Sequence, residues 1–383
     1  MIHLLLVIIY LSFISLGLPD GLLSAGWPSM YGPLEVDVSF AGIISMIICA
    51  GTILSSLMSD WLTHKLGAGK VTALSVATTA LALIGFSISD RFWMLCLWAV
   101  PYGLGAGSVD AALNNYVALH YSSRHMSWLH CMWGIGASTG PYVMGMILSG
   151  GGSWTTGYWT IGLLQILLTA ILLFSLPLWK DKSHRQDTPE SKPLPLTQVI
   201  RIPGAWEIMV AFFCYCALEQ TAALWSGSYL ALLVGYSGEE AASLASLFFL
   251  GMTVGRALSG FLTMKLDDTK MIRLGFVIIA LGIVTLMLPF GSTSALPGLL
   301  LVGLGCAPIY PCVIHSTPHH FGPERSQALI GIQMAAAYVG TALMPPLFGL
   351  IAQHLSLSLL APYLLILLLL MTLTHQKMLK KCR

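Results

Sequence analysis

The chain has 383 residues, of which 56% are hydrophobic and only 9% are charged. A soluble globular protein is about a quarter charged, so this composition excludes a soluble enzyme, a nucleic-acid-binding protein and a disordered scaffold. The net charge of +2 says little by itself. The mean hydropathy of +0.81 predicts an all-α protein that crosses a lipid bilayer many times.

The chain begins with an apolar run that has neither a basic segment nor a small-residue cleavage site, so we interpret residues 3–27 as a retained first span. A sliding hydropathy window predicts twelve membrane-spanning helices. They are expected at 3–27, 38–62, 71–89, 92–118, 126–150, 155–177, 204–231, 239–264, 270–290, 294–316, 325–351 and 356–375.

One long polar stretch interrupts these apolar runs. Residues 180–203 are charged and rich in proline, which is typical of a linker. The sequence therefore predicts an N-terminal six-helix bundle at 1–179 and a C-terminal six-helix bundle at 204–383.

The two halves carry a weak internal repeat. Residues 51–70 align with 251–270, and Lys65 recurs as Lys265. Apolar composition readily produces chance matches of Leu and Ala, but not of Lys residues that follow the second span of each half. The repeat predicts two pseudo-symmetric bundles with a binding site between them, near the bilayer midplane.

The basic residues are distributed asymmetrically. With the N-terminus placed inside, every Lys and Arg except Arg91 and Arg256 falls in a cytoplasmic segment, whereas the outer loops are acidic or uncharged. Cytoplasmic loops of membrane proteins carry such an excess of Lys and Arg. We therefore expect a multi-pass protein of a bacterial inner membrane with both termini in the cytoplasm.

Ionisable side chains inside the predicted spans are the main candidates for function. A charge at the bilayer centre costs about 3 kcal/mol or more on insertion scales, so such residues usually mark functional sites. Asp20, Asp110, Glu219 and Arg256 lie in predicted spans, and Asp60 lies at the inner end of the second span. For Asp60 and Arg256 we expect a structural or gating role.

Asp110 belongs to a stripe of small and polar residues. Gly103, Gly107, Asp110 and Asn114 share one helix face by their spacing, and the glycines allow another helix or a ligand to approach closely. Asn114 and its neighbour Asn115 are the only asparagines of the chain. The stripe predicts either a polar helix interface or a carboxylate that carries a proton or binds a hydroxyl group.

Asp20 follows Pro19, which together with two nearby glycines should interrupt the first helix. Interrupted helices near the midplane are typical of transport sites, although Asp20 also fits a helix-end cap near the outer surface. Glu219 and Gln220 occupy the corresponding point of the seventh span. The two halves therefore each place polar groups where a central cavity would be lined.

His130 in the fifth span, Tyr310 in the tenth and Gln333 in the eleventh are further cavity candidates, with a satisfied core residue as the alternative. The fifth span contains the pattern His-x-x-x-Gly-x-Gly-Ala, and the fourth contains Gly-x-x-Asp-x-x-x-Asn. Together with the Pro-Asp segment of the first span, and residues 255–260, 303–311 and 340–351, these stretches resemble the fucose–galactose–glucose:proton symporter family of the major facilitator superfamily.

The resemblance implies a secondary active transporter and not an enzyme, in which Asp20 and Asp110 couple proton uptake to sugar binding. It also implies that Asn114 and His130 contact the sugar. This chain departs from the fucose permease branch, which has Glu at the position of Asp110 and Gln at that of His130. Three hypotheses follow: a proton-coupled symporter of a hexose or deoxyhexose, a sodium-coupled sugar carrier, and a proton-driven exporter of amphipathic small molecules.

In the sugar hypothesis, three tryptophans are candidates for stacking on the apolar face of the ring, with interfacial anchoring or helix packing as the alternative. No cofactor is expected beyond the coupling ion, H⁺ or Na⁺, and the expected partners are a small-molecule substrate and the lipid bilayer, with the carrier acting as a monomer. The predicted substrate-binding residues are Asn114, Asn115, His130, Glu219, Gln220, Trp27, Trp133, Trp225, Tyr310 and Gln333.

Overall fold

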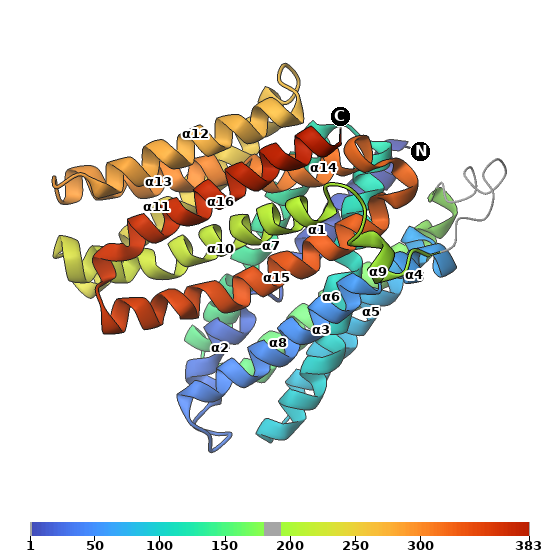
Figure 1. Ribbon diagram of the computed structural model, residues 1–383. Coiled ribbons are helices and arrows are strands. Elements are labelled where there is room, and N and C mark those ends of the chain that lie inside the picture. Colours follow the sequence, from blue (N-terminus) through green and yellow to red (C-terminus); the bar gives the residue numbers. More distant parts are fainter. Residues whose placement is uncertain (1, 180–192, 383) are drawn as a thin grey trace. The chain divides into compact units, whose positions relative to one another are not determined.

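The computed structural model describes residues 2–179 and 193–382, and every regular element in these ranges is a helix, as predicted (Figure 1). Residues 180–192 of the predicted linker lie outside the described residues. The helices of the first range are α1 (Ile2–Gly17), α2 (Leu22–Met30), η1 (Val38–Phe40), α3 (Ala41–Leu57), α4 (Ser59–Leu66), α5 (Ala68–Ser87), α6 (Phe92–His120), α7 (Ser123–Ser149), α8 (Trp154–Ser175) and η2 (Leu176–Leu178). Those of the second range are α9 (Leu196–Val199), α10 (Ala205–Tyr229), η3 (Leu230–Val234), α11 (Gly238–Leu262), α12 (Asp268–Met287), α13 (Ser292–Cys306), α14 (Ile309–Phe321), α15 (Pro323–His354), η4 (Leu357–Leu359) and α16 (Leu360–Lys381).

Each of the twelve predicted spans contains a helix, and the first and the tenth are each divided into two. Within the described ranges, eleven helical segments are long and apolar enough to cross a membrane. The remaining predicted span is α7, a helix of 27 residues that contains several Gly, Ser and His residues and so falls short on composition, not on length.

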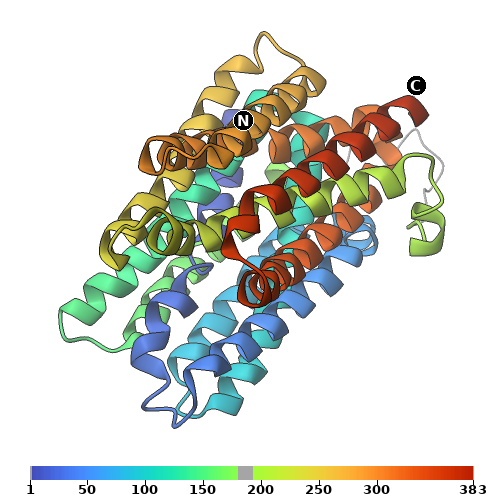
Figure 2. The same cartoon turned by 60° about the vertical axis from the view of Figure 1, so that its left-hand side comes forward.

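The described residues form two compact units. Unit 1 contains those within 1–116 and 129–194, and unit 2 contains those within 117–128 and 195–383. In unit 2, α10 packs against α15 and α16, and α13 packs against both α11 and α12 (Figures 1 and 2). In unit 1, α5 packs against α8.

The internal repeat is confirmed by equivalent glycine contacts in the two units. A Cβ added at Gly51 would lie 3.1 Å from the backbone N of Leu104, and one added at Gly251 would lie 3.0 Å from that of Leu304. A Cβ at Gly103 would collide with the carbonyl of Ile48, and one at the equivalent Gly303 with that of Phe248. The same backbone approach is therefore built twice, between α3 and α6 and between α11 and α13.

The first span is interrupted, as the Pro19 segment predicts. Helix α1 ends at Gly17 and α2 begins at Leu22, and between them the Asp20 N–H donates to the carbonyl of Gly17 over 3.1 Å in a tight turn. Asp20 therefore lies outside both helices.

The backbones of α1 and α7 touch where they cross. A Cβ added at Gly136 would collide with the carbonyl of Ile14, and one added at Gly140 would collide with that of Leu18. Only glycine permits this approach, which brings the interrupted part of the first span against α7.

Asp60 ties α4 to the end of unit 1. The Nδ1–H of His64 donates to the Asp60 backbone carbonyl over 2.9 Å and lies 3.1 Å from its carboxylate, while the other carboxylate oxygen accepts the Leu194 N–H over 3.1 Å. The Asp60 side chain is buried. Through these contacts Asp60 joins α4 to the backbone at Leu194.

A pH-dependent contribution to stability follows from the His64 contact. The hydrogen bond to the Asp60 carboxylate raises the pKa of His64 above its ordinary value of 6.5. Because the pKa of His64 is higher in the folded state, its contact with Asp60 contributes its full stabilisation at a pH below 6.5. This contribution is lost as the pH rises through the pKa that His64 has in the folded protein. Thermal unfolding in detergent between about pH 5 and pH 9 should therefore show the advantage of the parent over His64→Gln shrinking as the pH rises; an advantage independent of pH would contradict this.

Candidate functional site

The Asp20 carboxylate is held by a tryptophan of α7. The indole N–H of Trp133 donates to Asp20 Oδ2 over 2.9 Å, and Asp20 is exposed whereas Trp133 is partly buried. The glycine-lined crossing of α1 and α7 sets this distance. Trp133 was predicted to stack on a substrate, but in the structure its polar edge is engaged by the carboxylate.

A chain of hydrogen bonds joins Asp110, Asn114 and His130. The side-chain amide of Asn114 donates to Asp110 Oδ1 over 2.8 Å, and the Asn114 carbonyl oxygen lies 3.1 Å from Nε2 of His130. Because that oxygen only accepts, His130 Nε2 carries a hydrogen in this arrangement. All three residues are at least 94% buried, and Phe13 packs edge-on against the imidazole.

The two acids predicted to couple a proton, Asp20 and Asp110, both lie in unit 1. The interrupted first span, α6 and α7 thus gather two acids, an amide, an imidazole and an indole within unit 1. Such a group can store a proton in place of one negative charge.

The glycines of the Asp110 stripe serve helix packing. A Cβ at Gly107 would collide with the carbonyl of Thr52, so α6 lies directly against α3 at this point. Serines of α3 support the same seam, since the hydroxyl of Ser56 donates to the Gly107 carbonyl over 3.3 Å. The stripe therefore fixes α6 so that Asp110 and Asn114, further along the same helix, have defined positions.

Two other predicted residues of unit 1 are buried. Trp27 is 5% exposed within the apolar cluster around Met30 and Trp154, and its indole N–H donates to the carbonyl of Val38 over 2.7 Å. This position suits a packing role, and we do not include Trp27 in the proposed binding site. Asn115 is also buried, at 6% exposure.

In unit 2, Glu219 faces Arg256. The Arg256 guanidinium Nη2 lies 4.0 Å from Glu219 Oε1. Arg256 is 5% exposed and Glu219 is 8% exposed. The second carboxylate oxygen of Glu219 is buried and accepts no hydrogen bond from the described residues. The pair neutralises two charges, but it leaves one acceptor open for a hydroxyl donor.

We expect the Glu219→Leu substitution to lower the free energy of unfolding by about 3 kcal/mol or more, because a buried Arg256 would lose its counter-charge. Replacing both residues with leucine should recover most of that loss. Thermal unfolding in detergent measures both values. The exposed Lys270–Asp267 pair, with a separation of 2.9 Å, serves as the control; Lys270→Ala should cost no more than about 1 kcal/mol. A double variant less stable than Glu219→Leu would contradict the pairing.

The remaining predicted residues of unit 2 are held by their neighbours. The Tyr310 hydroxyl donates to Met334 Sδ over 3.0 Å, and its ring packs on Phe212 with centroids 4.7 Å apart. Gln333 is fully buried and exchanges hydrogen bonds with Thr317 over 3.1 and 3.3 Å.

Trp225 and Gln220 are partly exposed, as is Tyr310, whereas Gln333 is buried. The Trp225 indole N–H donates to the Pro345 carbonyl over 3.0 Å, which ties α10 to α15. Gln220 is partly exposed on α10, next to Glu219. Gln220 is therefore the more accessible amide of the two predicted in this unit, since Gln333 is sealed in the core.

Two repeated bundles of long apolar helices, with acids buried inside them, define a secondary transporter of the membrane and not an enzyme. The family model described as Major Facilitator Superfamily matches residues 9–296 and 227–376. The chain belongs to the Major Facilitator Superfamily and is a multi-pass membrane transporter.

Relatives and solved structures agree with this assignment. An uncharacterized MFS-type transporter of Yersinia pestis is 25% identical over 347 residues, which cover 88% of this chain and 87% of that protein. The glucose/mannose transporter GlcP of Bacillus subtilis (strain 168) is 20% identical over 292 residues, which cover 72% and 68%. A crystal structure of FucP, the Escherichia coli fucose:proton symporter, matches with a TM-score of 0.77 at 14% identity and covers 96% of this chain and 98% of that one.

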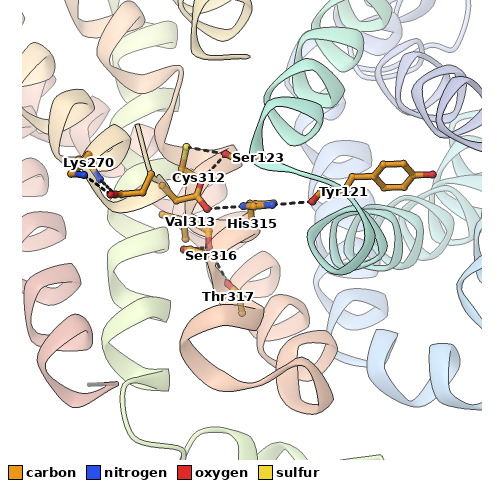
Figure 3. Close-up of polar contacts among 10 residues, drawn as sticks. Tyr121, Ser123, Lys270, Cys312, Val313, His315, Ser316 and Thr317 are labelled. Atoms are coloured by element: carbon orange, nitrogen blue, oxygen red, sulfur yellow. Dashed lines mark hydrogen bonds and ion pairs between the residues drawn. The ribbon is translucent and has the colours of Figure 1, made fainter. Parts of the chain in front are cut away.

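Several polar contacts of the structure have no counterpart in the sequence pattern. Ser15 and Gln165 hydrogen-bond each other in the core of unit 1, with the Gln165 amide donating to the Ser15 carbonyl over 2.6 Å. Asp268 and His315 of unit 2 form an ion pair over 2.6 Å (Figure 3). Asp268 was overlooked because it lies at a helix start beside an exposed acid, where a solvated cap is the ordinary interpretation.

Proposed function

We propose that this transporter is a proton-coupled symporter of a hexose or deoxyhexose that works by alternating access. The observation that carries the proposal is the hydrogen-bonded chain of Asp110, Asn114 and His130, whose three side chains are buried. Amide and imidazole groups bind sugar hydroxyls. A carboxylate among them is a group that can take up and release a proton.

The comparisons support this choice of cargo and ion. FucP is named a fucose:proton symporter and GlcP a glucose/mannose transporter. The Pro-Asp segment and the residues of the hydrogen-bonded chain are among the stretches that resemble the fucose–galactose–glucose:proton symporter family.

In the proposed cycle, Asp110 takes up a proton and the sugar binds, so that the loaded carrier rearranges without an unpaired carboxylate. A bare charge at the bilayer centre would add about 3 kcal/mol or more to the barrier. One proton moving down a potential of 100 mV supplies about 2.3 kcal/mol. That corresponds to a concentration ratio of about 50-fold, since about 1.4 kcal/mol is a factor of ten.

Counterflow uptake in proteoliposomes tests the proposal. A panel of labelled hexoses and deoxyhexoses should be run with and without a pH gradient, and with and without sodium. Uptake that follows the pH gradient supports proton symport, and uptake that requires sodium would replace the proton with sodium. Drug resistance on overexpression without any hexose uptake would instead favour the exporter.

The Trp133–Asp20 hydrogen bond gives a prediction about the empty carrier. In a symport cycle the empty carrier returns deprotonated, and its carboxylates then avoid the cost of a bare charge only through their hydrogen-bond donors. The Trp133 N–H is the donor to Asp20 in that state. Trp133→Phe should therefore lower proton-driven accumulation about tenfold, the scale of a hydrogen bond to a charged group. Counterflow, in which only loaded carriers cross, should fall much less. An equal loss in both assays would show that Trp133 acts in sugar binding or folding instead.

We further propose that both termini face the cytoplasm of a bacterial inner membrane, and that the carrier works as a monomer with no cofactor beyond its coupling ion. The distribution of Lys and Arg supports this orientation. Protease protection of tagged termini in vesicles of known orientation tests it.

A further inference from the structure

One end of unit 2 contains a cavity that is separate from the predicted cargo-binding residues. The helices α10 and α12 end there, and α16 begins there (Figures 1 and 2). The cavity has a volume of about 310 Å³, which is at the lower limit of pockets that bind small molecules. It therefore has room for a slender molecule or for one chain of a larger one.

The end of α10 forms the first wall of the cavity, where Tyr229 and Leu233 line it. Here α10 continues into η3, in which the Gly235 N–H donates to the carbonyl of Leu230 over 3.1 Å, five residues back. This is the bond of a π-turn, which is wider than an α-helical turn. Because π-turns are rare and occur frequently at functional sites, this wall is a first indication of a binding site.

The last turn of α12 forms the second wall and is tied to the first. The Tyr229 hydroxyl donates to the carbonyl of Leu286 over 3.0 Å, so this bond fixes the distance between the two helix ends. Leu286 is buried, whereas the next two lining residues, Met287 and Leu288, are 50% and 43% exposed. The second wall therefore leads from a buried interior to an exposed apolar rim.

The third wall is formed by η4 and the start of α16, and it carries a hydroxyl group. Ser358 is exposed at the rim, and its hydroxyl lies 2.8 Å from that of Ser356, with either group able to donate. Ala361, which also lines the cavity, is buried. The Ser358 hydroxyl can therefore donate to a carbonyl oxygen of a bound molecule while it accepts from Ser356.

The rim continues into a surface of exposed apolar side chains. Leu232, Phe290 and Leu355 lie in or beside the segments that form the three walls, and each is more than 60% exposed. Large exposed apolar patches mark contacts with a membrane or a partner, and these segments are the ends of helices that are long and apolar enough to cross a membrane. The cavity is thus continuous with the lipid-facing surface, so a molecule of the bilayer can enter it.

The charges near the cavity indicate which lipid headgroup fits. Glu240 is exposed in the first turn of α11, shortly after η3. Neither Lys nor Arg occurs in residues 228–242, 284–295 or 352–363, which include the three walls. An anionic headgroup would therefore meet a like charge and no opposite one. A zwitterionic headgroup does not have this disadvantage.

We propose that this cavity binds one acyl chain of a zwitterionic phospholipid, and that the ester carbonyl of that chain accepts a hydrogen bond from Ser358. A chain that moves from the bilayer into an apolar cavity gains little hydrophobic energy, because lipid tails are as apolar as the lining side chains. The selectivity of the site depends instead on the Ser358 hydroxyl and on the fit between the three walls. The inference is independent of the cargo and of the coupling ion.

Photoactivatable phosphatidylcholine, with a diazirine in one acyl chain, tests the proposal on the full-length protein in detergent micelles. After irradiation, mass spectrometry of peptides locates the labelled residues. Labelling of residues 229–233, 286–288 and 358–362 should saturate at a single bound lipid. Val277 and Leu281, which are exposed on α12 outside the cavity, report ordinary lipid contact. Their labelling should rise in proportion to the probe.

Two substitutions of Ser358 change the site from an exposed position, where the fold tolerates them. Ser358→Ala should lower the saturable labelling about fivefold, the scale of one neutral hydrogen bond, and Ser358→Trp should abolish it by filling the rim. Thr293→Ala and Thr293→Trp are the matched controls, because Thr293 is exposed at the start of α13 and does not line the cavity. Both controls should be labelled like the parent.

Two results would overturn the site and leave only ordinary lipid contact: labelling of the cavity segments that never saturates, or labelling that Ser358→Trp leaves unchanged. Photoactivatable phosphatidylglycerol, which is anionic, tests the headgroup. It should label the cavity segments more weakly than phosphatidylcholine does, and equal or stronger labelling would overturn the assignment of a zwitterionic lipid.

Discussion

Replacing Asp110 with asparagine is expected to abolish accumulation driven by a pH gradient while leaving the protein folded. The carboxylate Oδ1 accepts the Asn114 amide, and an asparagine side chain can present its carbonyl oxygen to the same donor. The amide cannot take up a proton, however, so the coupling step is lost. Internal sugar should then equilibrate and no longer reach the roughly 50-fold ratio that a potential of 100 mV supports for one proton.

Uphill uptake and counterflow in the same proteoliposomes measure this effect. Counterflow through Asp110→Asn should persist, because a permanently neutral residue imitates the protonated, loaded carrier. Asp90→Asn, which alters an exposed acid between α5 and α6, is the matched control and should accumulate sugar like the parent. Undiminished uphill uptake by Asp110→Asn would refute the assignment of the proton to this residue.

The second large effect is expected at the crossing of α1 and α7. A Cβ at Gly140 would collide with the carbonyl of Leu18, and neither backbone can yield without moving the whole helix. Gly140→Val should therefore lower the free energy of unfolding by about 3 kcal/mol or prevent folding, as overpacking of a tight contact does. Any protein that does fold should fail to transport, because the same crossing sets the distance between Trp133 and Asp20.

Gly145, on the same helix, is the matched control for this substitution. A Cβ there meets no atom within 4 Å. Gly145→Ala should leave stability unchanged or raise it slightly, since alanine is the better helix former by about 1 kcal/mol. Thermal unfolding in detergent compares the two variants, and equal stability of Gly140→Val and Gly145→Ala would contradict the close backbone contact.

The helices and the repeat were accessible from sequence because both depend on local patterns. Runs of apolar residues predict spans wherever they fall, and Gly103 and Gly303 recur at matching points because the same helix contact is built twice. The interruption of the first span followed from Pro19, whose ring cannot continue a helix ladder. The bond between Asp110 and Asn114 was foreshadowed by their spacing, since residues four apart lie on one helix face.

Contacts between distant segments were not accessible in the same way. Ser123 and Asp268 are 145 positions apart, and His315 lies 47 positions from Asp268. No periodicity of the sequence indicates that residues so far apart come into contact. Trp27 shows a second reason why sequence is insufficient. An aromatic residue near an acid in the sequence is compatible both with stacking on a substrate and with core packing, and the sequence does not reveal that Trp27 is buried in the structure.

The break between α1 and α2 has an electrostatic consequence for Asp20. In a continuous helix this carboxylate would lie in the middle, far from the partial charges at the two helix ends. Here α2 starts anew at Leu22, and the Leu22 N–H donates to the Pro19 carbonyl over 3.1 Å. The partial positive charge at the start of α2 therefore lies directly after Asp20. The backbone at the start of α2 therefore supplies a partial positive charge beside Asp20. Because no side chain makes this charge, a side-chain substitution removes it only if the two helices become continuous.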